Sequence, residues 1–68
     1  MKAKIYIHDY YEVDNTTAFY ASITMGTDLD DYDYCDEYIT RNYATKAEAV
    51  TKAMQICEMF GIAEVVYA

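Results

Sequence analysis

The sequence predicts an α+β fold in one domain, residues 1–68, with the element order β-β-β-α-β. Three observations predict it: two N-terminal segments alternate apolar and polar residues, a capped helix follows, and a short apolar segment comes last. We expect a four-stranded, mostly antiparallel sheet with the helix on one face. An average domain has roughly 100–150 residues, so 68 residues leave no room for a second domain.

The first two strands are predicted from alternation. Residues 2–8 and 17–25 each place apolar side chains at every second position, which is typical of half-buried strands. The segment 12–16 (EVDNT) is predicted to form the turn between them, because Asp and Asn bond their own backbone. Gly26 is expected to end the second strand.

A third strand is predicted over residues 34–43, after an acidic loop at 27–33. Its apolar residues Cys35, Ile39 and Tyr43 share their register with Glu37 and Arg41. Charged side chains on an inward-facing register are unfavourable, so we expect a β-bulge or a late strand start here.

The helix is predicted over residues 46–60. Thr45 and Glu48 have the spacing of a capping box, and Gly61 is a natural left-handed residue at the helix end. An apolar stripe at helical spacing comprises Ala49, Val50, Ala53, Met54, Ile56, Cys57 and Phe60. Residues 62–67 (IAEVVY) are predicted to form the last strand, parallel to the first, in the spatial order 3-2-1-4.

One sheet face should lie under the helix, and the other should be open. We expect the covered face to carry Ala3, Ile5, Ile7, Phe19, Ala21 and Ile23. We expect the open face to carry Tyr6, His8, Tyr20, Ser22, Thr24, Tyr38 and Thr40. The chain contains nine tyrosines, and a tyrosine-rich open face would suit the docking of a protein or of a second copy.

The charge balance excludes several classes of partner. Twelve acids against five bases give a formal net charge of −7, so direct contact with nucleic acid or an anionic membrane is not expected. No apolar run approaches the ~18 residues of a membrane span, and no signal-peptide core follows the basic N-terminus. We therefore expect a cytoplasmic protein whose two cysteines, Cys35 and Cys57, are reduced.

The acids are concentrated in one stretch. Between Asp9 and Tyr38 there is no Lys or Arg, and six acids fall within residues 28–37. Ten extended residues reach ~33 Å, about the length of ten base pairs, so such a row of carboxylates can occupy a groove built for phosphates. The alternative is a solvated acidic loop. The candidate partner-binding residues are Asp28, Asp30, Asp31, Tyr32, Asp33, Tyr34, Asp36, Glu37 and Tyr38.

No catalytic or metal-binding motif is present. His8 is the single histidine, and the sequence has neither a phosphate-binding loop nor a dinucleotide fingerprint. Counted from Asp28, the EF-hand positions that require glycine and an acid are Asp33 and Ile39. We therefore expect no enzyme activity, no catalytic residue, no metal site and no cofactor.

In size, acidity and lack of a catalytic set, the chain resembles the small phage-encoded anti-CRISPR proteins. The stretch Asp28–Glu37 (DLDDYDYCDE) contributes most to this resemblance. The resemblance implies an inhibitor, a mimic of DNA, that binds a CRISPR effector complex on its basic nucleic-acid-binding surface. Two alternatives stay open: a homodimeric interaction module that uses the tyrosine-rich sheet face, and a small enzyme or metal-dependent regulator.

Overall fold

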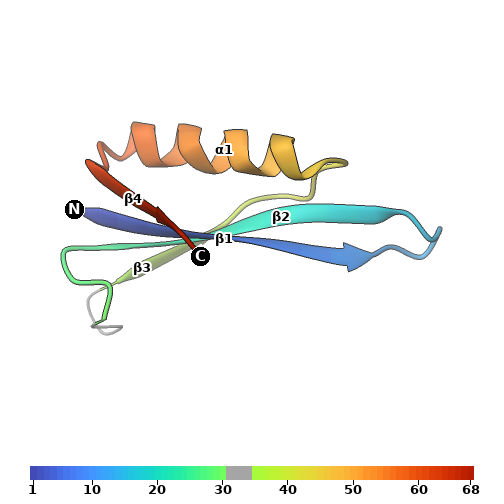
Figure 1. The fold of residues 1–68 in the computed structure, drawn as a ribbon, viewed down its shortest axis with the longest axis horizontal. Coiled ribbons are helices and arrows are strands. Elements are labelled where there is room, and N and C mark those ends of the chain that lie inside the picture. The colour runs from blue at the N-terminus through green and yellow to red at the C-terminus, as the bar shows by residue number, and fades with distance from the viewer. Residues whose placement is uncertain (31–34) are drawn as a thin grey trace.

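The computed structural model describes residues 1–30 and 35–68, which form a helix lying across one face of a four-stranded sheet (Figure 1). The elements are β1 (Lys2–Tyr11), β2 (Thr17–Gly26), β3 (Asp36–Ile39), α1 (Lys46–Met59) and β4 (Glu64–Tyr67). The strand order is β3-β2-β1-β4, with β2 antiparallel to both of its neighbours and β4 parallel to β1. The predicted fold class, element order and strand order are confirmed.

The two long strands form a hairpin whose tight turn is made by residues 12–16. Asp14 Oδ1 accepts hydrogen bonds from the Thr16 backbone N–H at 3.1 Å and from the Thr16 hydroxyl at 2.6 Å. Asn15 adopts a φ of 66°, a left-handed conformation that Asn tolerates better than most residues. The predicted bond from a turn side chain to the backbone is therefore confirmed for Asp14, whereas Asn15 contributes its backbone conformation.

The third strand is shorter than predicted, because it starts late and is interrupted by a bulge. Regular pairing with β2 covers only Asp36–Ile39, and a separate bridge joins Tyr43 to Phe19. Between them, Thr40 N–H donates to the carbonyl of Ala21, and the Thr40 hydroxyl accepts the Ala21 N–H, each at 2.9 Å. Phe19 and Ala21 of β2 are two residues apart, whereas their partners Tyr43 and Thr40 are three residues apart. The segment that follows β3 therefore contains one extra residue, which forms the bulge.

This pairing corrects the predicted faces of the third strand. Tyr38 pairs with Ile23, whose side chain lies under the helix, so Tyr38 is on the covered side and not on the open face. Thr40 is buried and bonded to Ala21, which also removes it from the open face. Ile39 pairs with Ser22 and projects from the open face instead, where it is exposed.

Helix α1 begins and ends at specific capping residues. The Thr45 hydroxyl accepts the Glu48 N–H at 3.2 Å, as the capping box predicts. At the other end, Gly61 has a φ of 66° and donates to Glu58, while Ile62 N–H donates to the Cys57 carbonyl at 2.9 Å. These two bonds constitute a Schellman motif, which turns the chain back toward β4.

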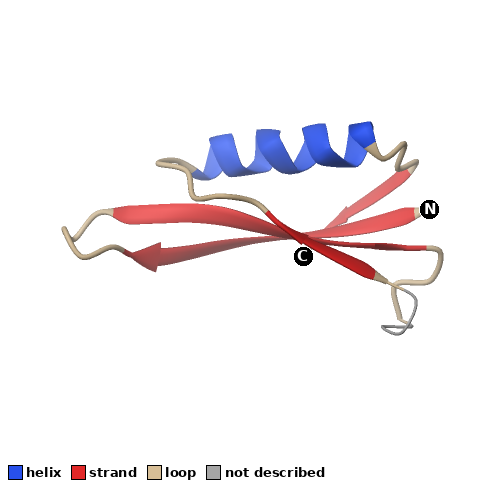
Figure 2. Cartoon of the chain, turned by 180° about the vertical axis from the view of Figure 1, so that it is seen from behind, coloured by secondary structure: helices blue, strands red, loops and turns tan. Residues whose placement is uncertain are grey.

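The core lies between α1 and the central strands β1 and β2 (Figure 2). Ile5, Ile23 and Cys57 are its largest fully buried side chains. The buried cluster consists of Ala3, Ile5, Ala21, Ile23, Met25, Ala53, Ile56 and Cys57, with Ile7, Ile62 and Val65 packed at its edge. Small side chains at Ala21, Ala49 and Ala53 let the helix approach the sheet closely.

Candidate functional site

The predicted acidic site lies at the end of the molecule where β2 passes into β3. Asp28 and Asp30 lie in the connection, Asp36 and Glu37 open β3, and all four side chains are exposed. We call these four residues the acidic end. Four further predicted site residues, Asp31, Tyr32, Asp33 and Tyr34, lie outside the described residues.

Asp28 and Asp30 are held in a local turn at the start of the connection between β2 and β3. Asp28 Oδ1 accepts the Asp30 N–H at 3.0 Å, a local turn that shortens the segment. In β3, Asp36 pairs with Met25 on the helix side, whereas Glu37 pairs with Thr24 on the open side. The carboxylates therefore surround this end of the molecule and do not form a single line.

No salt bridge joins a basic side chain to the acidic end within residues 1–30 and 35–68, although Lys4 lines the same hollow as Asp30 and Glu37. The one salt bridge there joins Lys2 to Glu64, with Nζ 3.7 Å from Oε2. The acids of the acidic end are not part of it. The four side chains are therefore exposed to solvent and form no salt bridge with a described basic residue.

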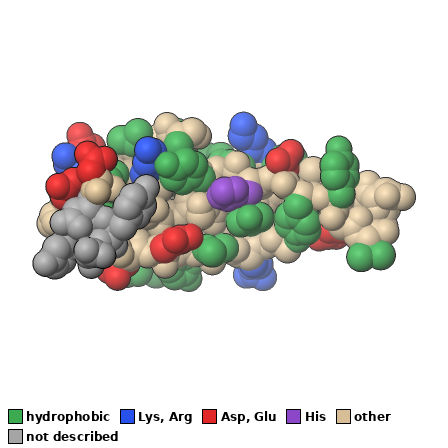
Figure 3. Space-filling view, turned by 90° about the horizontal axis from the view of Figure 1, so that it is seen from below, with side chains coloured by type: hydrophobic (Ala, Val, Ile, Leu, Met, Phe, Trp, Pro, Cys, Tyr) green, Lys and Arg blue, Asp and Glu red, His purple; other side chains and the backbone are tan. Residues whose placement is uncertain are grey.

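The open sheet face carries a continuous row of rings along β1 and β2. The ring centroids of His8 and Tyr20 are 4.7 Å apart with planes at 16°, and Tyr6 stacks on His8 at 6.4 Å. Tyr10 meets Tyr20 edge-on at 6.0 Å, and Lys4 Nζ lies 5.4 Å from the Tyr6 centroid. Figure 3 shows this face, with the histidine near its middle and several hydrophobic side chains close by.

Sequence reasoning did not identify the contact between His8 and Ser22, which lie diagonally on adjacent strands, since His8 pairs with Tyr20 and Ser22 with Tyr6. His8 Nε2 lies 2.9 Å from Ser22 Oγ, at the edge of a hollow of about 480 Å³ between the ring row and the connection at Leu29 and Asp30. Catalysis by a Ser–His pair requires an orienting acid and oxyanion donors. No carboxylate bonds the His8 ring in the described part of the chain, and Ser22 is paired with strands on both sides. The contact therefore links β1 to β2 and lacks the parts of a catalytic triad.

Tyr10 ties the open face to the loop that follows β3. Its hydroxyl accepts a hydrogen bond from Asn42 Nδ2 and lies 3.5 Å from Glu12 Oε1. Desolvation, followed by the negative charge of Glu12 and its hydrogen bond, raises the pKa of Tyr10 above 10.0. These contacts place Tyr10 at one end of the ring row.

The exposure of Phe60 differs from what the apolar stripe of the helix predicts. Phe60 was assigned to the buried stripe, yet 52% of its surface is exposed. Its ring lies 6.5 Å from that of Tyr38, in an edge-on arrangement. The neighbouring Met59 is 79% exposed. We call Tyr38, Met59 and Phe60 the apolar patch, since exposed apolar side chains that lie together on a protein surface mark contact sites.

The described residues contain neither a cluster of metal ligands nor a helix that could span a membrane. No group of three or more His, Cys, Asp and Glu side chains is placed to hold a metal ion in residues 1–30 and 35–68. Within the same residues, α1 is too short and too polar to cross a membrane.

Comparisons of the chain with protein-family models, with curated proteins and with solved structures returned no match.

Proposed function

We propose that this protein is a non-catalytic inhibitor that binds a basic, nucleic-acid-binding surface of another protein. The observation that carries the proposal is the acidic end: four exposed carboxylates that form no salt bridge with a described basic residue. A cluster of exposed acids is complementary to a surface rich in Lys and Arg. The resemblance to anti-CRISPR proteins makes a CRISPR effector complex of a bacterial host the first partner to test.

The proposed mechanism is competition. Exposed ion pairs contribute only ~0–1 kcal/mol each, so affinity requires several pairs that lose water together. Opposite charges also accelerate the encounter of two proteins, and this acceleration falls as salt rises. Binding is therefore expected to be fast, salt-sensitive and mutually exclusive with nucleic acid.

The test uses a panel of purified CRISPR effector complexes of different types and a fluorescent target DNA. The protein is expected to lower DNA binding by at least one complex at about 0.1 M salt, and less at higher salt. The double variant Asp28→Lys, Asp30→Lys should lose this effect. No inhibition of any complex in the panel would refute the proposal.

A matched control separates local from global charge. The variant Asp9→Lys, Glu12→Lys changes two exposed acids away from the acidic end. Each substitution adds two charges, so both double variants move from −7 to −3. Equal loss of inhibition in both variants would mean that net charge alone is responsible.

A second candidate function, a homodimeric module, is favoured by the uncovered ring row. The charges around that row are locally balanced, because Lys2 and Lys4 lie on the same face as Glu37 and Glu64. Two copies could therefore meet there without strong repulsion. This function predicts a dimer that survives high salt in sedimentation experiments and dissociates in Tyr6→Arg, while a monomer at all salt concentrations would refute it.

A further inference from the structure

We infer that the apolar patch of Tyr38, Met59 and Phe60 is the anchor of the same interface, and that the partner presents an apolar pocket bordered by Lys or Arg. This inference rests on the proposed function and adds to it the residues that supply most of the affinity. None of the sequence-predicted site residues lies in the helix, so Met59 and Phe60 extend the site to a second element.

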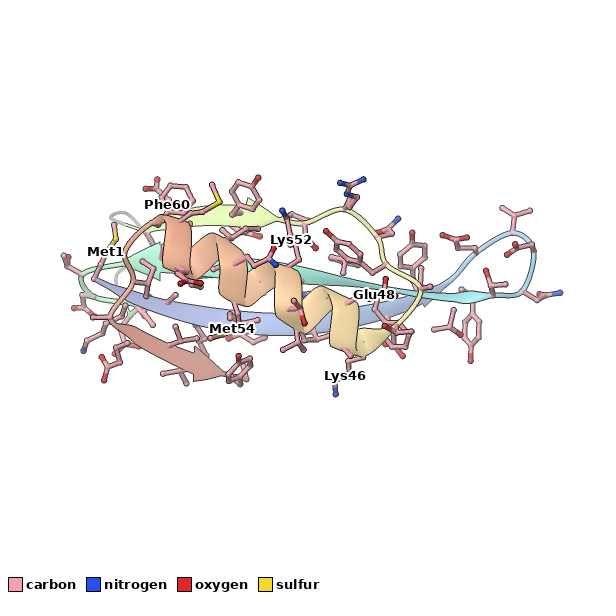
Figure 4. The ribbon with its side chains drawn as sticks, turned by 90° about the horizontal axis from the view of Figure 1, so that it is seen from above. Met1, Lys46, Glu48, Lys52, Met54 and Phe60 are labelled. Carbon is pink, nitrogen blue, oxygen red and sulfur yellow. The ribbon has the colours of Figure 1, made fainter. Side chains whose placement is uncertain are left out.

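The three side chains lie together on the β3 side of α1. Tyr38 reaches this side because its pairing with Ile23 turns it toward the helix, where its ring meets that of Phe60 at 6.5 Å. Met59 follows Lys52 by seven residues, which places both on one side of a helix. Figure 4 shows Lys52 on the side of α1 that faces β3, with Met54 on the opposite side, and Phe60 at the end of the helix beside β3.

The side chains of the apolar patch are exposed to water, which is unfavourable, and a partner that covers them would remove this free-energy cost. Exposure is 44% for Tyr38, 79% for Met59 and 52% for Phe60. The three side chains lie outside the buried cluster between α1 and the sheet, and each is exposed in the described structure. Aromatic side chains that are buried at the centre of an interface are typical binding hot spots.

The surrounding charges indicate the chemistry of the partner. Asp36 precedes Tyr38 by two residues and therefore lies on the same face of β3. Glu58 is exposed beside Met59, and the acidic end is at the same end of the sheet. Two copies meeting at this patch would bring like charges together, whereas a basic surface with an apolar pocket would satisfy both the acids and the rings.

The acidic end and the apolar patch should affect different rate constants of binding. Exposed charges steer the encounter and affect the association rate, while a buried aromatic anchor affects the dissociation rate. Removal of the anchor should therefore leave the salt dependence of association unchanged. Removal of the acids should reduce that dependence.

The experiment measures association and dissociation rates with each purified CRISPR effector complex of the panel. The protein is tested as wild type, as Phe60→Ala, as the acid variant Asp28→Asn, Asp30→Asn, and as the control Met54→Ala. Met54 is also an exposed apolar residue of α1, but it contacts Tyr67 on the far side. Phe60→Ala should weaken binding at least about 30-fold through faster dissociation. Met54→Ala should bind as the wild type does.

A second measurement does not depend on the stability of Phe60→Ala. A photoreactive benzoylphenylalanine replaces Phe60 in one variant and Met54 in another, and crosslinks to the purified complex are mapped by mass spectrometry. Crosslinks from position 60 and none from position 54 support the inference.

The outcomes separate the inference from the proposed function. If the acid variant loses binding while Phe60→Ala keeps it within about twofold, the anchor is refuted and the acidic interface remains. If the wild type binds no complex, the proposed function fails and the anchor with it. If position 60 crosslinks to a second copy of the chain, the patch is a self-association surface and the basic partner is refuted.

Discussion

Ile62 donates its backbone N–H to the carbonyl of Cys57 at 2.9 Å, and this bond closes the helix over a left-handed Gly61. The same turn places Ile62 against the core and leaves Phe60 projecting from the end of the helix. The helix end therefore controls both the direction of β4 and the position of the apolar patch.

Gly61→Ala should destabilise the protein by about 1–2 kcal/mol, because an alanine is strained at a φ of 66°. A Cβ at this position would meet no atom within 4 Å, so the cost is conformational and not steric. Urea unfolding measures the change, and Gly61→Asn should cost less because Asn tolerates this conformation. Equal stability of Gly61→Ala and the wild type would contradict the role of this turn.

Thr40→Val should destabilise the protein by about 1–3 kcal/mol, since the buried N–H of Ala21 would lose its acceptor. Thr40→Ser keeps the hydroxyl and should recover most of that loss. Thr27→Val, at an exposed position, serves as the control and should change stability by less than about 0.5 kcal/mol. A Thr40→Val variant as stable as this control would mean that the bulge does not depend on the hydroxyl.

The hairpin turn should lose stability in acid. The hydrogen bonds from Thr16 hold the pKa of Asp14 below its ordinary value of 3.8. A carboxyl whose pKa is lowered by folding stabilises the native state above its unfolded pKa, and this contribution disappears as pH falls through the folded pKa. The wild type should therefore exceed Asp14→Asn in stability at about pH 6, and the difference should shrink below about pH 4.

Urea unfolding of both proteins across this pH range measures that difference. Asp9→Asn is the control, because Asp9 is an exposed aspartate of β1 outside the turn. A difference between the wild type and Asp14→Asn that stays constant from pH 6 to about pH 2 would rule out the proposed contribution.

The two thiols should react at very different rates in the native protein. Burial in the core raises the pKa of the Cys57 thiol, so less of it is thiolate at neutral pH, and its side chain is 1% exposed. Cys35 precedes β3 at a partly exposed position. Labelling with a disulfide reagent at about pH 8 should modify Cys35 first and Cys57 more than about 100-fold more slowly.

Mass spectrometry of the labelled protein identifies the modified residue, and Cys35→Ser provides the matched control. In about 6 M guanidinium the two thiols should react at similar rates. Rapid modification of Cys57 in the native protein would show that α1 separates from the sheet more readily than the packing indicates.

The elements of the fold that are set by residues close together in the sequence were predicted correctly. The two alternating strands and the capped helix follow from residues 2–25 and 45–61, and the strand order follows once the strands at 34–43 and 62–67 are added. The phase of β3 does not, because it depends on an extra residue that pairs with β2 only in the folded chain. One such residue turns Tyr38 from the open face to the helix side.

In the candidate site, too, some features follow from the residue types alone and others only from the folded structure. Exposure of Asp28, Asp30, Asp36 and Glu37 is a direct consequence of their charge, so the sequence was sufficient to predict it. Phe60 continues the apolar stripe at helical spacing, and nothing in that spacing says that its ring stays half exposed beside Tyr38. Its exposure is a property of the assembled layers.

The turn of the β1–β2 hairpin is a suitable place to attach a label. Strands of ten residues span about 34 Å, so the turn at residues 12–16 is at the opposite end of β1 and β2 from the acidic end and the apolar patch. Val13 at this turn is fully exposed. A fluorophore or an affinity tag attached there would be about one strand length from the acidic end and the apolar patch.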